Sequence, residues 1–97
     1  MSSEAYAATL AKYGVCETPT GRFTFNRASG SIHLTARLGA SEEVRYHGGC
    51  SFGLGDRPWV AAFDGVHFSG LTQEEVLTWL VERMVTHDAV KRLGGFA

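Results

Sequence analysis

The chain is poor in the residues that define several specialised classes of protein. Its 97 residues include only two cysteines and two prolines, and the formal net charge is -1. A scaffold held by disulfides contains many more cysteines, and a protein drawn to polyanions by its overall charge carries a strong basic excess. The composition therefore excludes both classes and indicates an ordinary globular domain.

Long hydrophobic runs are also missing. No apolar segment approaches the length of a membrane span. The first residues, Met1–Tyr6, lack the basic region and the apolar stretch of a secretory signal. Cys16 and Cys50 are not spaced as a C-x-x-C pair, which favours free thiols over a Cys16–Cys50 disulfide. These absences predict a cytoplasmic protein that does not enter a membrane.

The glycine-rich passage contains fragments of catalytic motifs but no complete one. Gly49–Gly53 fits the G-x-S-x-G pattern around Ser51, yet hydrolases with this pattern have a helix after the serine, and here a loop is expected. Cys50 would need a neighbouring base, such as His47 or His67, to act as a nucleophile. No oxyanion-hole element accompanies these residues. We therefore interpret Cys50 as a structural cysteine and predict no enzymatic activity.

Motifs for cofactors and metals are absent as well. The glycine-rich passage lacks the G-K-[ST] ending of a phosphate-binding loop, and Gly53–Pro58 lacks the third glycine of the dinucleotide fingerprint. His33, His47 and His67 share one predicted face, but the chain has none of the paired-ligand motifs typical of structural zinc sites. The sequence predicts neither a cofactor nor a metal site, and Gly48–Pro58 is expected to be a loop.

What the chain does have is a long alternation of apolar and polar residues between Gly21 and Ser69. The apolar positions include Phe23, Phe25, Ile32, Leu34, Ala36, Leu38, Val44 and Tyr46. The polar positions between them include Arg22, Thr24, His33, Thr35, Arg37, Arg45 and His47. Because strand side chains alternate with a period of two, this pattern predicts a sheet with one apolar face and one cationic face.

The alternating stretches predict strands at about residues 22–26, 31–38, 43–47 and 59–63. Glycine, serine and asparagine residues lie between them, as expected of turns. Residues 17–20, which include a proline, are predicted to be linker.

Asp64–Gly65 is a strong signal for a two-residue hairpin, because a type I′ turn needs positive φ at both central positions. This turn pairs Phe63 with Val66 and Ala61 with Phe68. The aromatic residues then lie on the apolar face of the sheet, and the intervening histidine lies on the polar face.

Two amphipathic helices flank the predicted sheet. Ser2 or Ser3 caps a short N-terminal helix, which Gly14 ends. Thr72–Glu75 fits a capping box at the start of a second helix. The apolar stripe of this second helix consists of Val76, Leu77, Leu80, Val81 and Met84. Together these elements predict a single α+β domain over residues 1–97: a four- to five-stranded antiparallel sheet with the C-terminal helix on its apolar face and a short N-terminal helix.

The polar sheet face and the glycine-rich loop form the candidate partner-binding surface. Its residues are Arg22, His33, Arg37, Arg45, His47 and His67 from the strands, and Phe52, Leu54 and Arg57 from the loop. The planar guanidinium of arginine suits carboxylates and phosphates. An exposed Phe52 or Leu54 would supply an apolar anchor.

Two kinds of partner suit such a surface. Proteins that bind single-stranded nucleic acid on a sheet stack bases on exposed aromatic residues, whereas here the aromatic residues fall on the apolar face. The sequence therefore favours a protein partner, a larger complex with an acidic surface, and leaves nucleic acid as the alternative. A polar face that binds nothing and a homodimer through an uncovered sheet edge also stay open.

A resemblance in layout rests on the hairpin Phe63-Asp64-Gly65-Val66 and the following segment Leu71-Thr72-Gln73-Glu74-Glu75-Val76-Leu77-Thr78-Trp79-Leu80. The arrangement resembles that of small phage-encoded inhibitors, including anti-CRISPR proteins. Such inhibitors are about this size and combine a bent antiparallel sheet with one or two helices. The resemblance implies an inhibitor or adaptor that works without catalysis, by occluding a surface of a large host complex.

Overall fold

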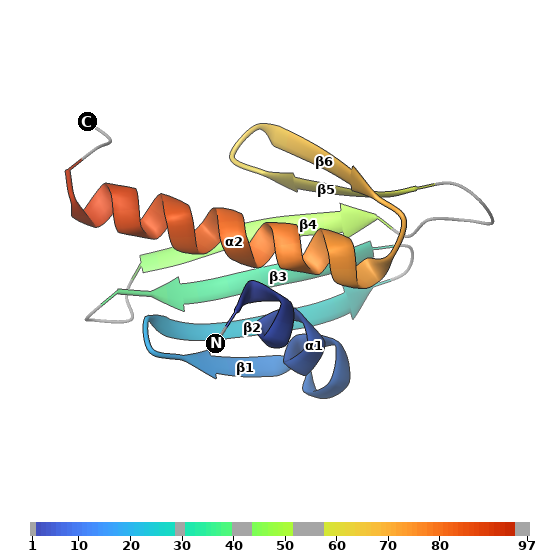
Figure 1. Ribbon diagram of the computed structural model, residues 1–97, viewed down its shortest axis with the longest axis horizontal. Coiled ribbons are helices and arrows are strands. Elements are labelled where there is room, and N and C mark those ends of the chain that lie inside the picture. Colours follow the sequence, from blue (N-terminus) through green and yellow to red (C-terminus); the bar gives the residue numbers. More distant parts are fainter. Residues whose placement is uncertain (1, 29–30, 40–43, 52–57, 95–97) are drawn as a thin grey trace.

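The computed structural model describes residues 2–28, 31–39, 44–51 and 58–94. These residues form a six-stranded antiparallel sheet with two helices on one of its faces (Figure 1). In chain order the elements are α1 (Ser3–Tyr13), β1 (Val15–Thr18), β2 (Gly21–Ala28), β3 (Ser31–Leu38), β4 (Val44–Ser51), β5 (Trp59–Phe63), β6 (Val66–Gly70) and α2 (Gln73–Arg92). The strands lie in the sheet in their order along the chain. The α+β prediction is confirmed, but the predicted number of four to five strands is too low.

The additional strand is β1, whose last two residues, Glu17 and Thr18, belong to the segment predicted to be linker. It pairs with β2 in a register that sets Cys16 opposite Phe23, and both side chains are buried. The Thr18 hydroxyl accepts hydrogen bonds from the N–H groups of Thr20 and Gly21, at 3.3 and 3.2 Å, and so fastens the turn. Because only one side chain of β1 is fully buried, its alternation is too short to be recognised from sequence.

Strand β4 continues through Gly48–Ser51, where the sequence predicted the start of a loop. Cys50 points into the core and is 3% exposed. A Cβ atom at Gly48 would come within 2.8 Å of Leu80 Cδ2 and 2.9 Å of Met84 Cε. This glycine therefore allows α2 to approach the sheet closely, and it does not interrupt the strand.

The ends of the helices follow the predicted capping residues. The Ser2 hydroxyl accepts a hydrogen bond from the N–H of Ala5 at 3.3 Å, and Gly14 follows α1 with a left-handed φ of 78°. Thr72 caps α2 by accepting from the N–H of Glu75 at 3.2 Å. Helix α2 is continuous to its C-terminal end. Neither described helix is both long and apolar enough to cross a bilayer.

The core fills the space between the sheet and the two helices. Its largest fully buried side chains are Phe23, Ile32, Leu34 and Leu38 from the strands and Leu10, Val76, Leu77, Leu80, Val81 and Met84 from the helices. The predicted apolar stripe of α2 is thus buried in full. Burying one such side chain contributes about 1.5–3 kcal/mol, so contact between the sheet and the helices is the main source of stability.

One charged side chain is buried in the same layer. Asp88 on α2 is 2% exposed, and its Oδ1 accepts a hydrogen bond from the Tyr46 hydroxyl at 3.0 Å. Arg92 Nε lies 2.9 Å from Asp88 Oδ2, as an ion pair without the alignment of a hydrogen bond. Burial, together with the hydrogen bond to Asp88, raises the pKa of Tyr46 to about 12. This contact ties β4 to α2.

Candidate partner-binding surface

The face of the sheet that points away from the helices carries the candidate residues. We call it the open sheet face; its described residues are Val15, Glu17, Arg22, Thr24, Asn26, Ser31, His33, Thr35, Arg37, Arg45, His47, Gly49, Ser51, Val60, Ala62, His67 and Ser69. All six predicted strand residues are exposed there, namely Arg22, His33, Arg37, Arg45, His47 and His67. The predicted loop residues Phe52, Leu54 and Arg57 lie outside the described part of the chain.

The register of the sheet aligns three arginines across β2, β3 and β4. Arg22 is the direct partner of Arg37, and Arg37 is the direct partner of Arg45. We call these three residues the arginine row. Adjacent strands lie about 4.8 Å apart, so three guanidinium groups project side by side from a rigid base. The sequence placed these residues on one face, but only the register shows that they form a row.

The arginine row is only partly neutralised. Arg22 Nε donates a hydrogen bond of 2.6 Å to Glu17 Oε1 at the end of the row. Among the described residues, no carboxylate lies within ion-pair distance of Arg37 or Arg45. Like charges directly opposite each other on neighbouring strands destabilise a sheet. Among the described residues, Arg37 and Arg45 are thus adjacent cationic groups without an acidic partner.

The three histidines of the open sheet face surround a shallow depression of about 510 Å³ beside the arginine row. The depression is lined by His33, His47, Gly48, Gly49, Ala62, Phe63, Asp64, Gly65 and His67. Gly49 lines the depression next to His33, and a Cβ atom on this glycine would be in ordinary van der Waals contact with His33 Nδ1 at 3.8 Å. His33 Nε2 lies 3.3 Å from Ser31 Oγ, and His47 Nδ1 lies 3.4 Å from Thr35 Oγ1.

The described residues contain no group of three or more histidine, cysteine, aspartate or glutamate side chains placed to hold a metal ion. The three histidines are therefore spread around the depression and do not converge on one point. Their ring N–H groups are nevertheless available as hydrogen-bond donors to an acidic ligand.

The structure does not assemble the Cys50–histidine pair considered from the sequence. Cys50 lies on the helix side of β4, whereas His47 and His67 lie on the open sheet face. Burial raises the pKa of Cys50 to about 11, although a backbone hydrogen bond at Ile32 and the charge of Arg27 act in the opposite direction. Within the described residues Cys50 is a buried free thiol without an adjacent base, which matches its interpretation as a structural cysteine.

The strand aromatics lie on the helix side of the sheet, as the alternation predicted. Phe23, Tyr46 and Phe63 are buried, and the remaining strand aromatics pack partly buried against the core. No phenylalanine, tyrosine or tryptophan lies on the described part of the open sheet face. That face has arginines for anionic groups but no aromatic platform on which nucleobases would stack.

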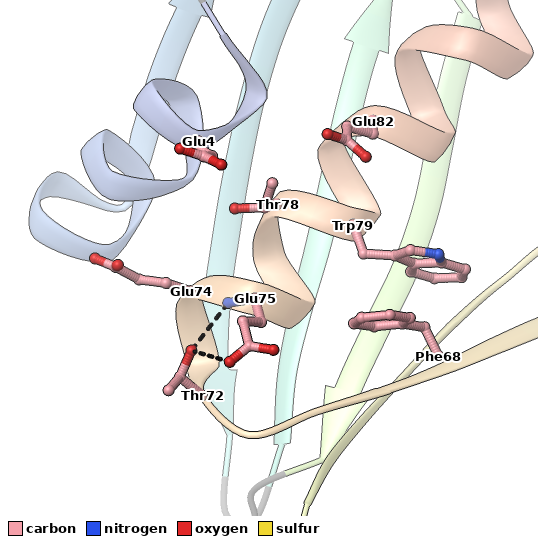
Figure 2. Close-up of a pocket in the computed structure, with 8 residues that line it drawn as sticks. All are labelled: Glu4, Phe68, Thr72, Glu74, Glu75, Thr78, Trp79 and Glu82. Carbon is pink, nitrogen blue, oxygen red and sulfur yellow. Dashed lines mark hydrogen bonds between the residues drawn. The ribbon is translucent and has the colours of Figure 1, made fainter.

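A second unusual surface lies on the helix side and was not identified as a site from the sequence. A groove of about 430 Å³ is lined by Glu4, Phe68, Thr72, Glu74, Glu75, Thr78, Trp79 and Glu82 (Figure 2). We call it the acidic groove. Phe68 and Trp79 stack at one side of it with ring centroids 5.5 Å apart and planes inclined by 10°. The spacing of the glutamates on α2 was visible in the sequence, whereas the positions of Glu4 and Phe68 depend on tertiary structure.

Within the part of the chain that the structure describes, the glutamates of the acidic groove form no ion pair. The ion pairs among the described residues use three other acids, Glu17, Asp64 and Asp88, and none uses a glutamate of the groove. The Glu75 carboxylate contacts the cap of its own helix, where Thr72 Oγ1 donates to Glu75 Oε1 at 3.4 Å. The helix side also carries cations: Arg83 Cζ lies 5.7 Å from the centroid of the Trp79 ring, although none of the ion pairs among the described residues joins Arg83 to a glutamate of the groove.

Comparison of the chain with protein-family models, with curated proteins and with solved structures found no match.

Proposed function

We propose that this chain is a non-enzymatic protein-binding module whose open sheet face docks on an acidic surface of a larger protein complex. The observation that carries the proposal is the arginine row, with Arg37 and Arg45 adjacent and without an acidic partner in the described residues. Placing these side chains together costs stability. An acidic partner would offset that cost, because charge-assisted bonds between guanidinium and carboxylate groups are stronger than neutral hydrogen bonds.

Steric occlusion is the mode of action that suits this surface. The molecule measures 42 × 28 × 23 Å along its principal axes. Its broad face is large enough for an interface of about 800 Å² on each partner, the usual size in a specific complex. A rigid sheet also loses little conformational freedom on binding. The resemblance in layout to small phage-encoded inhibitors supports an inhibitor that covers a working surface of its target.

Nucleic acid is the competing ligand for the same arginines. The lack of exposed aromatic residues on the described open sheet face favours protein, because sequence-tolerant binding of single strands relies on base stacking. Affinity for nucleic acid would also fall steeply with salt concentration, since each neutralised phosphate releases counterions.

The proposal is tested by affinity capture of the tagged chain from nuclease-treated bacterial lysate, followed by mass spectrometry. The wild type is compared with R37E/R45E, which reverses the unpaired charges of the open sheet face. A matched control, K12E/K91E, makes the same change in net charge on the two helices. We expect one stoichiometric complex to be retained by the wild type and the control and lost by R37E/R45E.

Two outcomes would contradict the proposal. Retention of the same complex by R37E/R45E would show that the arginine row does not form the interface. Retention of nucleic acid without nuclease, and of nothing after nuclease, would assign the row to nucleic-acid binding.

A further inference from the structure

The outer edge of the sheet at β6 has unpaired backbone groups. Strand β6 pairs only with β5, through a two-residue turn at Asp64 and Gly65 with φ of 51° and 77°. In such a turn the flanking residues exchange hydrogen bonds, and bonded and non-bonded positions then alternate along the strand. The N–H and C=O groups of His67 and Ser69 therefore point outward, and no hydrogen bond from another described residue reaches them.

This edge lacks the features that usually block pairing with another chain. Val66–Gly70 contains no proline and no lysine, and its register with β5 is continuous without a bulge. The opposite edge strand, β1, has four residues and contacts α1, whereas β6 has five residues and contacts α2. Edge β6 is therefore the longer of the two described edges.

The helix side of β6 is chemically distinctive because it adjoins the acidic groove. Phe68 presents its ring there, stacked with Trp79. Glu75 lies over Gly70: a Cβ atom built on that glycine would be 3.0 Å from Glu75 Cβ and 3.3 Å from its Oε2. Figure 2 shows Glu75 next to this aromatic pair, with Glu4 and Glu74 on the other side of α2.

We propose that β6 accepts an extended, basic segment of a partner protein as an additional antiparallel strand. Its backbone bonds to the outward groups of His67 and Ser69. An apolar residue opposite Phe68 packs on the Phe68–Trp79 pair, and an arginine or lysine opposite Gly70 meets the Glu75 carboxylate. This is strand addition with specificity from alternate side chains.

The charge of the groove selects this occupant over a second copy of the chain. A symmetric pairing of two β6 strands centred on Phe68 would place Val66 of the second copy opposite Gly70. The valine would remove water from the Glu75 carboxylate without supplying a cation, which is unfavourable. A basic segment instead supplies a positive charge to Glu75, which lies over Gly70 and has no ion-pair partner among the described residues; the cation Arg83 lies over the Trp79 ring.

The test uses the full chain and a fluorescein-labelled peptide, Ser-Arg-Thr-Val-Thr-Arg-Ser, whose apolar and cationic residues fall on one face of a strand. A second peptide carries glutamate in place of both arginines. We expect saturable binding of the arginine peptide in fluorescence anisotropy and at least tenfold weaker binding of the glutamate peptide. In hydrogen exchange, the amides of His67 and Ser69 should gain protection when the arginine peptide binds.

Variants at Ser69 and Glu75 test separately the backbone groups of the β6 edge and the charge of the acidic groove. S69P removes an outward N–H that β5 does not use, and should weaken binding at least tenfold, whereas S69A keeps the N–H and should stay within twofold. E75K should weaken binding of the arginine peptide at least tenfold while leaving the fold intact. If S69P does not fold, protection of His67 and Ser69 in the wild type decides the question.

Three results would overturn the proposal. They are the absence of saturable binding to the wild type, equal affinity of S69A and S69P, and binding without protection of His67 and Ser69. A wild type that is dimeric by sedimentation, with S69P monomeric, would instead assign the edge to a second copy. Because R37E/R45E leaves this edge unchanged, the peptide should bind that variant normally, so this test and that of the open sheet face fail independently.

Discussion

The open sheet face and the buried layer between the sheet and the helices differ in whether their charged side chains have partners within the described fold. On the helix side the buried Asp88 contacts Tyr46 and Arg92, so its charge is compensated within the fold. On the open sheet face Arg37 and Arg45 are adjacent and have no acidic partner among the described residues. The buried charge therefore has partners that can stabilise the fold, whereas our proposal assigns the two arginines to the binding of a partner.

The largest expected difference in the free energy of unfolding is between substitutions at two neighbouring residues of β2 that lie on opposite faces of the sheet. Phe23 is fully buried and its neighbour Thr24 is exposed on the open sheet face. F23A should lower the free energy of unfolding by about 3–5 kcal/mol, because it leaves a cavity under the helices. T24A should change it by less than about 0.5 kcal/mol. Urea denaturation followed by circular dichroism measures both, and equal losses would contradict the assignment of faces.

A smaller loss is expected when the buried carboxylate loses its hydrogen-bond donor. Y46F removes the hydroxyl that donates to Asp88 and should cost about 1–3 kcal/mol, the penalty of a buried group with one fewer partner. The matched control Y13F alters a side chain that is 66% exposed and should be neutral. The midpoints of thermal unfolding give the comparison, and a neutral Y46F would show that this contact does not contribute to stability.

The next prediction concerns the free energy of unfolding at alkaline pH, which should depend on the buried Cys50 thiol. Burial raises the pKa of Cys50 from 9.0 to about 11, so the folded chain holds the thiol proton to higher pH than the unfolded chain does. Unfolding therefore releases a proton above pH 9, and the associated stability, about 1–2 kcal/mol, is lost as pH rises toward 11. Stability curves from pH 8 to 11 should be flatter for C50A; identical slopes would contradict this attribution.

The smallest effect on stability is expected in the arginine row. R37A removes a like-charge neighbour of Arg22 and Arg45, so the free energy of unfolding should stay the same or rise by about 0.2–0.5 kcal/mol. Denaturant titration at low salt, where the repulsion is least screened, gives the most sensitive reading. A loss above 1 kcal/mol would mean that the row supports the fold.

The sequence predicts much of this architecture because its signals are local and repeated. The alternation in β2, β3 and β5, the Asp64–Gly65 turn and the stripe of α2 each depend on spacing within one element. Strand β1 escaped detection because it has one fully buried side chain. Strand β4 was predicted too short because its glycines resemble a loop, and only the packing of α2 explains Gly48.

Some features of the candidate surfaces could likewise be predicted from local sequence, whereas others depend on tertiary structure. The alternation of apolar and polar residues is enough to place the arginines and histidines on one face, because the face of a side chain depends only on its position within its own strand. Their alignment into a row depends on the register between strands, which the turns and packing determine. The acidic groove joins α1, α2 and β6, so no single segment of sequence could have predicted it.

The most direct test of the account is the affinity of R37A/R45A for the partner complex captured by the wild type. Truncation to alanine removes the attraction without adding a repulsive charge. We expect the affinity of R37A/R45A to be at least tenfold weaker than that of the wild type, and its denaturation midpoint to be unchanged or slightly higher. Unaltered affinity would contradict the claim that the uncompensated arginines of the open sheet face bind the partner.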